Sequence, residues 1–231
     1  MNWVTRTHVG LVRMLNEDTV FADSGLYGVA DGMGGHNAGE IASRIAADRM
    51  MERLHGKTPS QDLMKAALID VNRAVFTEQV SHKEYSGMGT TLTVLWEGSD
   101  AVYIGHIGDS RAYLLRDGVL KQMTQDHSLV QEMVSQGLIT REEALVHPYR
   151  NVITRAVGTD PYVESDCLTI DKKPGDIWLL CSDGLSNFVS DDLMEKILND
   201  QTRDAAADLL LQTALQNGGR DNISLLIAEV S

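Results

Sequence analysis

The spacing of apolar residues along this chain predicts where its helices lie. Between 38 and 54 they follow the 3.6-residue period of an amphipathic helix. A second helix is expected to start after Pro59-Ser60, where Ser60 is a favourable N-cap. Two more helices are predicted at 191–198 and 203–216, the latter closed by Gly218-Gly219.

Short apolar runs between these helices predict strands. Strands are expected at Thr19–Ala22, Leu26–Ala30, Thr90–Trp96, Ala101–Ile107, Arg111–Leu115, Val119–Met123, Ile177–Cys181 and Ile223–Val230. Asp117-Gly118 separates two of them and is typical of a hairpin turn. Because strands come in runs and helices in pairs, the order favours an α+β or layered sandwich fold over alternating βα units. A polar, helical-looking insert at Ser128–Pro148 interrupts the strands and has the character of a lid.

Charge and cysteine content exclude several classes of protein. The chain has 231 residues and a net charge of -13, which argues against nucleic-acid binding because such binding depends on Lys and Arg. The excess acid also has a simpler interpretation, solubility. Cys167 and Cys181 form no C-x-x-C pair, which excludes a disulfide scaffold or a thiolate zinc site. With no signal-peptide pattern and no membrane-length apolar run, we expect a cytoplasmic protein without membrane association.

Aspartates stand at positions where a buried strand ends. Asp31-Gly32 and Asp183-Gly184 each follow an apolar strand directly, so their carboxylates are rigidly aimed and partly desolvated. Other carboxylates flank further strands: Glu17, Asp18, Asp126 and Asp221. Hard divalent cations require such oxygen ligands, and the Gly32 carbonyl could add another. The pattern alone leaves two interpretations open, a metal site or turn and cap residues at loop ends.

The segment Asp31-Gly32-Met33-Gly34-Gly35-His36 is the most unusual of these. Its glycines free the backbone and bring His36 close beyond Asp31. A histidine beside a metal cluster can serve as a ligand or a general acid. Taken alone, such a histidine is more typical of a flexible turn with an exposed side chain.

Eight short motifs in order resemble those of the type 2C metal-dependent protein phosphatases (the PPM family), especially compact bacterial members. The matching segments are Arg13-Met14-Leu15-Asn16-Glu17-Asp18, Asp31-Gly32-Met33-Gly34-Gly35-His36, Gly87-Met88-Gly89-Thr90-Thr91, Gly105-His106-Ile107-Gly108-Asp109-Ser110-Arg111, Asp126-His127-Ser128, Thr154-Arg155-Ala156-Val157-Gly158, Ser182-Asp183-Gly184-Leu185 and Arg220-Asp221-Asn222-Ile223-Ser224. The resemblance covers nearly the whole chain. It implies one domain over residues 1–231, a four-layer αββα sandwich of two antiparallel sheets flanked by helices, and a flap at about 128–150.

The resemblance also implies a role for each site residue. It implies two or three divalent cations, Mn²⁺ or Mg²⁺, and a water or hydroxide bridging them that attacks phosphorus. The implied metal positions are Asp18, Asp31, the Gly32 carbonyl, Asp183, Asp221, Asp126 for a third ion, and Glu17 through water. Arg13 would hold the phosphate and His36 would protonate the leaving oxygen. Asp109 and Asn222 would support these residues without binding the metals.

The expected activity is hydrolysis of phosphoserine and phosphothreonine on proteins, reversing a Ser/Thr kinase in bacterial signalling. Two other functions stay open: a non-enzymatic binding module with this fold, and a hydrolase of small phosphate esters or nucleotides. A kinase of the eukaryotic-like type is expected as a partner by analogy alone. We expect a monomer. The flap is either a solvated cover or an element that selects the substrate.

Overall fold

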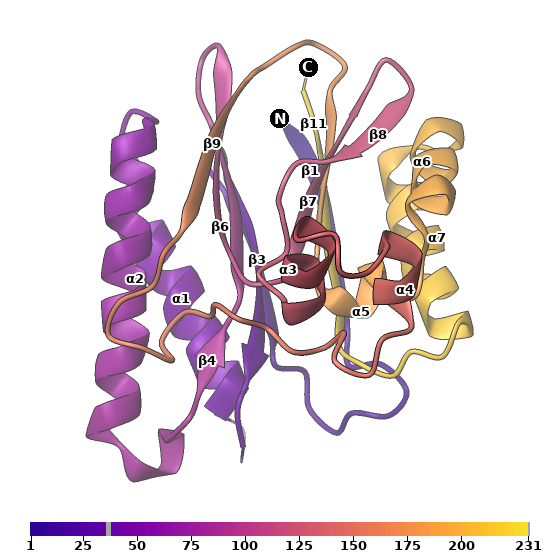
Figure 1. Ribbon diagram of the computed structural model, residues 1–231. Coiled ribbons are helices and arrows are strands. Elements are labelled where there is room, and N and C mark those ends of the chain that lie inside the picture. The colour runs from indigo at the N-terminus through magenta and orange to yellow at the C-terminus, as the bar shows by residue number, and fades with distance from the viewer. Residues whose placement is uncertain (36–37, 231) are drawn as a thin grey trace.

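The computed structural model describes residues 1–35 and 38–230 and shows two β-sheets packed face to face between layers of helices (Figure 1). Helices α1 (Ala38–Leu54) and α2 (Gln61–Ser81) cover one sheet. Helices α6 (Asp191–Asp200) and α7 (Arg203–Gln216) cover the other. The predicted four-layer sandwich is therefore confirmed.

Both sheets are antiparallel. The first has the strand order β1-β11-β10-β7-β8, and the second has the order β2-β3-β5-β6-β9 with β4 paired to β3. The strands are β1 (Asn2–His8), β2 (Asp18–Asp23), β3 (Leu26–Met33), β4 (Gly89–Thr90), β5 (Leu92–Glu97), β6 (Ala101–Ile107), β7 (Arg111–Arg116), β8 (Val119–Gln122), β9 (Asp166–Asp171), β10 (Ile177–Cys181) and β11 (Ile223–Glu229). The shorter helical segments are η1 (Lys83–Tyr85), α3 (Leu129–Ser135), α4 (Arg141–Leu145) and α5 (Asp183–Ser186).

Three apolar clusters hold the layers together. One lies between the sheets and includes the fully buried Trp178. The other two lie between each sheet and its helices, around Met50 and Leu68 on one side and Leu210 on the other. Because both faces of each central strand are buried, the strands read as continuous apolar runs.

Most predicted elements agree with the structure to within one or two residues. Ser60 caps α2 as expected, its side chain accepting a hydrogen bond from the Leu63 amide. Asp117 and Gly118 both have positive φ, which confirms the tight hairpin turn between β7 and β8. The strand predicted from Thr90 is two strands, β4 and β5. Strands β1 and β9 and the short α5 were not predicted.

The insert between β8 and β9 is longer than the predicted flap. It runs from 123 to 165 and carries α3 and α4, which lie at the front of the view in Figure 1. Its base is fixed by two antiparallel bridges, Ser128 to Ile153 and Thr90 to Val157. The flap therefore starts and ends on the rigid part of the molecule.

Candidate active site

Two aspartates from neighbouring strands face each other at one end of the second sheet. Asp18 begins β2, and its partner in the antiparallel register is Asp31 near the end of β3. Like charges directly opposite each other on two strands repel, so this arrangement costs free energy by itself. The Asp18 Oδ2 atom accepts a hydrogen bond of 2.8 Å from the Ser182 hydroxyl. Its buried Oδ1 atom has no partner among the described residues.

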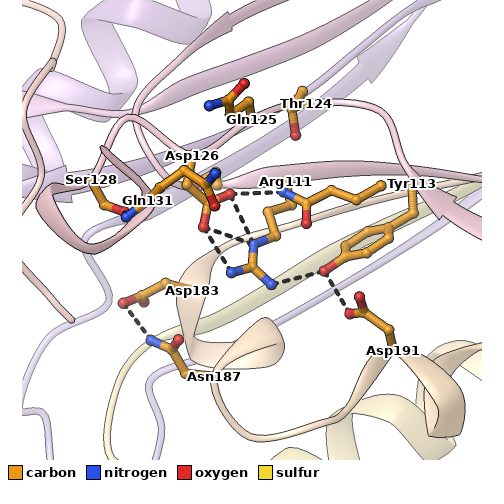
Figure 2. Close-up of polar contacts among 12 residues, drawn as sticks. Arg111, Tyr113, Thr124, Gln125, Asp126, Ser128, Gln131, Asp183, Asn187 and Asp191 are labelled. Carbon is orange, nitrogen blue, oxygen red and sulfur yellow. Dashed lines mark hydrogen bonds and ion pairs between the residues drawn. The ribbon is translucent and has the colours of Figure 1, made fainter. Parts of the chain in front are cut away.

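Asp183 and Asp221, which stand next to strands of the first sheet, lie near Asp18 and Asp31. Asp183 is the first residue of α5, separated from β10 by Ser182 alone, and Asp221 lies two residues before β11. A Cβ atom on Gly184 would collide with the carbonyl oxygen of Asn222, so only glycine allows these two segments to approach so closely. Asp183 accepts a hydrogen bond of 3.0 Å from Asn187, which is visible in Figure 2.

Burial and mutual repulsion disfavour the ionised forms of these carboxylates. Burial raises the pKa of Asp18 to about 6 and, with repulsion from Asp109, that of Asp183 to about 8. Burial and the charges of Asp18 and Asp183 place the pKa of Asp31 well above its ordinary value. The pKa of Asp109 rises to about 6, mainly through burial and then through the charge of Asp126. The cluster thus gathers carboxylates whose ionised forms a nearby positive charge would favour.

Gly32 lies where β3, α1 and the loop before β2 meet. A Cβ atom there would collide with the backbone oxygen of Gly39. The Gly32 amide donates a hydrogen bond of 3.2 Å to the Glu17 carbonyl. Burial raises the pKa of Glu17, whose side chain also approaches Gly39. The structure therefore places the Glu17 backbone beside Gly32, the residue that follows Asp31.

Arg13 lies in the loop between β1 and β2 and pairs with the cluster. Its Nη2 atom donates a 2.8 Å hydrogen bond to Asp221 Oδ2, and about half of its side chain is exposed. Asn222 fastens this loop, since its side chain donates to the carbonyls of Val9 and Leu15 and accepts from the Glu17 amide. This geometry fits the supporting position predicted for Asn222.

Asp126, predicted as a ligand of a third ion, forms an ion pair with Arg111 in the structure. Arg111 binds it through Nε, 3.0 Å from both carboxylate oxygens, and through Nη2, 2.7 Å from Oδ2 (Figure 2). Gln122 donates a further hydrogen bond to Oδ1 at 2.9 Å. Both oxygens are therefore already occupied by protein donors. Asp109, predicted only as a supporting residue, is instead the charged neighbour that most raises the pKa of Asp183.

Two contacts at the site were not predicted from the sequence. Ser182 hydrogen-bonds Asp18, and Arg111 neutralises Asp126, although both lie inside recognised motifs. Their residue types gave no signal beyond those motifs, because each contact joins segments far apart in sequence. The predicted general acid His36 lies outside the described residues.

The donor set fits hard divalent cations chemically. It consists of carboxylates and a backbone carbonyl, which are the ligands that Mn²⁺ and Mg²⁺ prefer, and the unpaired Asp18 Oδ1 is a free donor among them. In residues 1–35 and 38–230, however, no three Asp, Glu, His or Cys side chains are arranged closely enough to hold an ion as they stand. The aspartates would therefore have to rotate toward an ion, with water completing its coordination.

Comparison with known proteins agrees with this description. The family model described as protein phosphatase 2C matches residues 14–217. The serine/threonine protein phosphatase PstP of Mycobacterium tuberculosis is 41% identical over 233 residues, which are 100% of this chain and 45% of PstP. The chain thus spans about half the length of that relative. The serine/threonine phosphatase stp of Listeria monocytogenes is 38% identical over 237 residues, covering 97% of this chain and 94% of stp.

Solved structures show the same fold. A crystal structure of the M. tuberculosis phosphatase superposes with a TM-score of 0.95 at 39% identity, covering 100% of this chain and 98% of that one. The PstP catalytic domain in complex with two manganese ions gives a TM-score of 0.92 at 38% identity, with the same coverage. In the described part of the chain, no helix is both long enough and apolar enough to cross a membrane. The chain belongs to the protein phosphatase 2C family, as its motifs predicted.

Proposed function

We propose that this chain is a metal-dependent phosphatase that hydrolyses phosphoserine and phosphothreonine on proteins. The observation that carries the proposal is the cluster of four aspartates, Asp18, Asp31, Asp183 and Asp221, in which Arg13 pairs with Asp221. Family membership and the likeness to phosphatases over 94% of the length of stp support it.

The cluster is suited to hold divalent cations. Asp31 lies centrally, since its pKa responds to Asp18, Asp183, Asp109 and Asp221 together. We propose Asp31 as the residue shared by two ions, with the Gly32 carbonyl and Glu17 on one side and Asp18, Asp183 and Asp221 on the other. Bound Mn²⁺ or Mg²⁺ would supply Lewis-acid chemistry that lowers the pKa of water near a phosphate ester.

Asp109 is a better candidate than Asp126 for a ligand of a third ion, where one binds. Asp109 lies between the charges of Asp126 and Asp183 and keeps its raised pKa mainly through burial. Asp126 is neutralised by Arg111, which holds both of its carboxylate oxygens. We therefore propose Asp109 with Asp183 as the protein ligands of such an ion.

Arg13 is suited to orient the phosphate. Its guanidinium carries five N–H donors in a planar fork, one of which holds Asp221, and its exposed half faces incoming substrate. Two donors of such a fork can bind two phosphate oxygens at once. His36, outside the described residues, completes the proposal as the acid that protonates the leaving serine or threonine oxygen.

The remaining proposals concern the setting of the enzyme. We propose that the chain forms a single domain over residues 1–231 and is a monomer. We also propose that a Ser/Thr kinase of the eukaryotic-like type opposes it. The domain and the kinase rest on the family likeness. A cytoplasmic location is supported by the free thiols of Cys167 and Cys181. The physiological substrate is a phosphorylated protein in this proposal.

A substrate panel tests the activity. Phosphate release would be measured with Mn²⁺ from a phosphothreonine peptide, a nucleoside triphosphate and a small aryl phosphate, for wild type and Asp31→Ala. The proposal expects turnover of the peptide that is lost in Asp31→Ala. Preference for the nucleotide would favour a small-ester hydrolase, and no turnover by folded wild type with bound Mn²⁺ would favour a binding module.

A further inference from the structure

The loop that carries Arg13 also exposes a group of apolar side chains. Between β1 and β2, the side chains on both sides of Arg13 in sequence are exposed, Met14 at 93% and Val12 at 66%. We call the four exposed residues of this loop the apolar rim: Leu11, Val12, Met14 and Leu15. Single exposed apolar residues are ordinary on a protein surface, whereas exposed apolar patches mark surfaces that another molecule covers.

Hydrogen bonds hold the backbone beneath the apolar rim. The Leu11 amide donates to the Gly219 carbonyl at 2.6 Å. The Asn222 side chain donates to the carbonyls of Val9 and Leu15, at 3.0 and 2.8 Å. The rim is therefore presented on a fixed loop, so a ligand that contacts it loses little affinity to ordering of the loop.

The same loop lies against the carboxylate cluster. A Cβ atom on Gly10 would collide with the backbone oxygen of Asp221, and the Arg13 Nη2 atom lies 2.8 Å from Asp221 Oδ2. In Figure 1 the loop is at the lower edge of the molecule, below α5, whose first residue is Asp183. The rim thus adjoins the residues proposed to hold the phosphate and the cations.

Folding does not account for these side chains. Among the described residues, the three apolar clusters that hold the layers together include no member of the rim. Apolar surface left in water adds nothing to stability, because the hydrophobic effect acts only on surface removed from water. Contact with another molecule would remove it.

We propose that Val12 and Met14 are specificity-determining residues that contact the substrate residues next to the phosphorylated one and favour apolar side chains there. The proposal rests on the proposed function in taking Arg13 as the residue that holds the phosphate. Consecutive Cα atoms of a peptide lie about 3.8 Å apart, so the neighbours of a phosphothreonine held by Arg13 come within reach of the side chains that flank Arg13. Such contacts remove apolar surface of both partners from water.

The charges beside the loop favour an apolar neighbour over an acidic one. The hydrogen bond from Arg13 to Asp221, together with the charges of Asp221 and Glu17, raises the pKa of Arg13. An acidic substrate residue here would meet these two carboxylates, and the one guanidinium between them is already shared with Asp221. A basic substrate residue would be attracted by the same carboxylates, so it is the alternative that the test must separate from an apolar one.

The experiment compares phosphothreonine peptides that differ only in the two residues flanking the phosphothreonine, which are both leucine, both serine or both lysine. A non-hydrolysable phosphonate replaces the phosphate, and Kd is measured by fluorescence anisotropy with the full chain and Mn²⁺. For wild type we expect the leucine peptide to bind about tenfold more tightly than the serine peptide, which corresponds to burial of part of two apolar side chains. In Met14→Ser this preference should fall to about threefold, and in Val12→Ser/Met14→Ser to less than about twofold.

Val119→Ser is the matched control. Val119 in β8 is 63% exposed, close to the exposure of Val12, and β8 lies at the opposite edge of the first sheet from β1. The variant removes the same kind of side chain from an equally exposed position away from Arg13, so it should keep the full preference for leucine. Circular dichroism and the Tm of each variant would verify folding.

Three results would overturn the inference. Wild type could bind the leucine and serine peptides equally, prefer lysine, or bind none of the peptides. The double variant could keep the full preference for leucine. The serine substitutions could also change the oligomeric state in sedimentation without changing peptide affinity, which would make the rim an interface between two copies of the chain. Phosphate release from a small aryl phosphate, which has no neighbouring residues, is measured separately, so failure of the proposed activity is distinguished from failure of the preference.

Discussion

Replacing Asp18 by asparagine should stabilise the metal-free protein. Asp18 is half-buried, faces Asp31 across the strand pair and has a buried, unpaired Oδ1 atom. Asparagine has the same shape without the charge, and its Oδ1 atom can still accept from Ser182. Its amide can donate toward Asp31, so the substitution replaces a repulsive contact with an attractive one.

The size and pH dependence of this effect follow from the pKa of Asp18. That pKa rises from 3.8 to about 6 on folding. At 1.36 kcal/mol per unit, ionised Asp18 costs the folded state roughly 3 kcal/mol. Because the folded pKa is the higher one, this cost is absent below the unfolded pKa and is complete once the pH has risen through about 6. The advantage of Asp18→Asn should therefore grow from near zero at about pH 4 to roughly 3 kcal/mol at about pH 8.

Urea unfolding with chelator, at several pH values between these limits, measures the effect. With Mn²⁺ in place of chelator the order should reverse, since wild type gains binding free energy that the variant loses. Asp23→Asn, at the exposed end of the same strand, is the control and should change stability by less than about 0.5 kcal/mol. An Asp18→Asn protein that is no more stable than wild type at about pH 8 in chelator would refute the reasoning.

Two further substitutions test other parts of the site. Arg13→Lys should raise KM for a phosphopeptide by about tenfold with a smaller effect on kcat, because lysine cannot bind two phosphate oxygens as a fork. An unchanged KM would show that Arg13 does not bind the phosphate. Gly184→Ala should lower the free energy of unfolding by about 2 kcal/mol or more and weaken Mn²⁺ binding, because the new methyl group collides with Asn222 beside Asp221. Wild-type values for both quantities would contradict the close approach of the Gly184 and Asn222 segments.

The sequence predicted the central elements well because their burial is regular. The bounds predicted for α1 and α7 are those of the structure. Strands β1 and β9, both at sheet edges, were missed. Their residues are mostly half-buried or exposed, so neither alternation nor a continuous apolar run marks them.

The candidate site was predicted less evenly than the fold. Motifs identified Asp18, Asp31, Asp183 and Asp221, and the structure brings all four together. They did not distinguish Asp109 from Asp126, because that distinction depends on which carboxylate Arg111 reaches. Arg111 and Asp126 come from separate segments, and no local pattern shows that their side chains meet.

The most direct test of the account is phosphate release from a phosphothreonine peptide as Mn²⁺ is added to chelator-treated protein, for wild type and Asp31→Asn. The account predicts no release in chelator, release that rises and saturates as Mn²⁺ is bound, and a folded Asp31→Asn protein that stays inactive at every Mn²⁺ concentration. Release by wild type in chelator, or full activity of Asp31→Asn with Mn²⁺, would contradict the claim that this carboxylate cluster holds the catalytic cations.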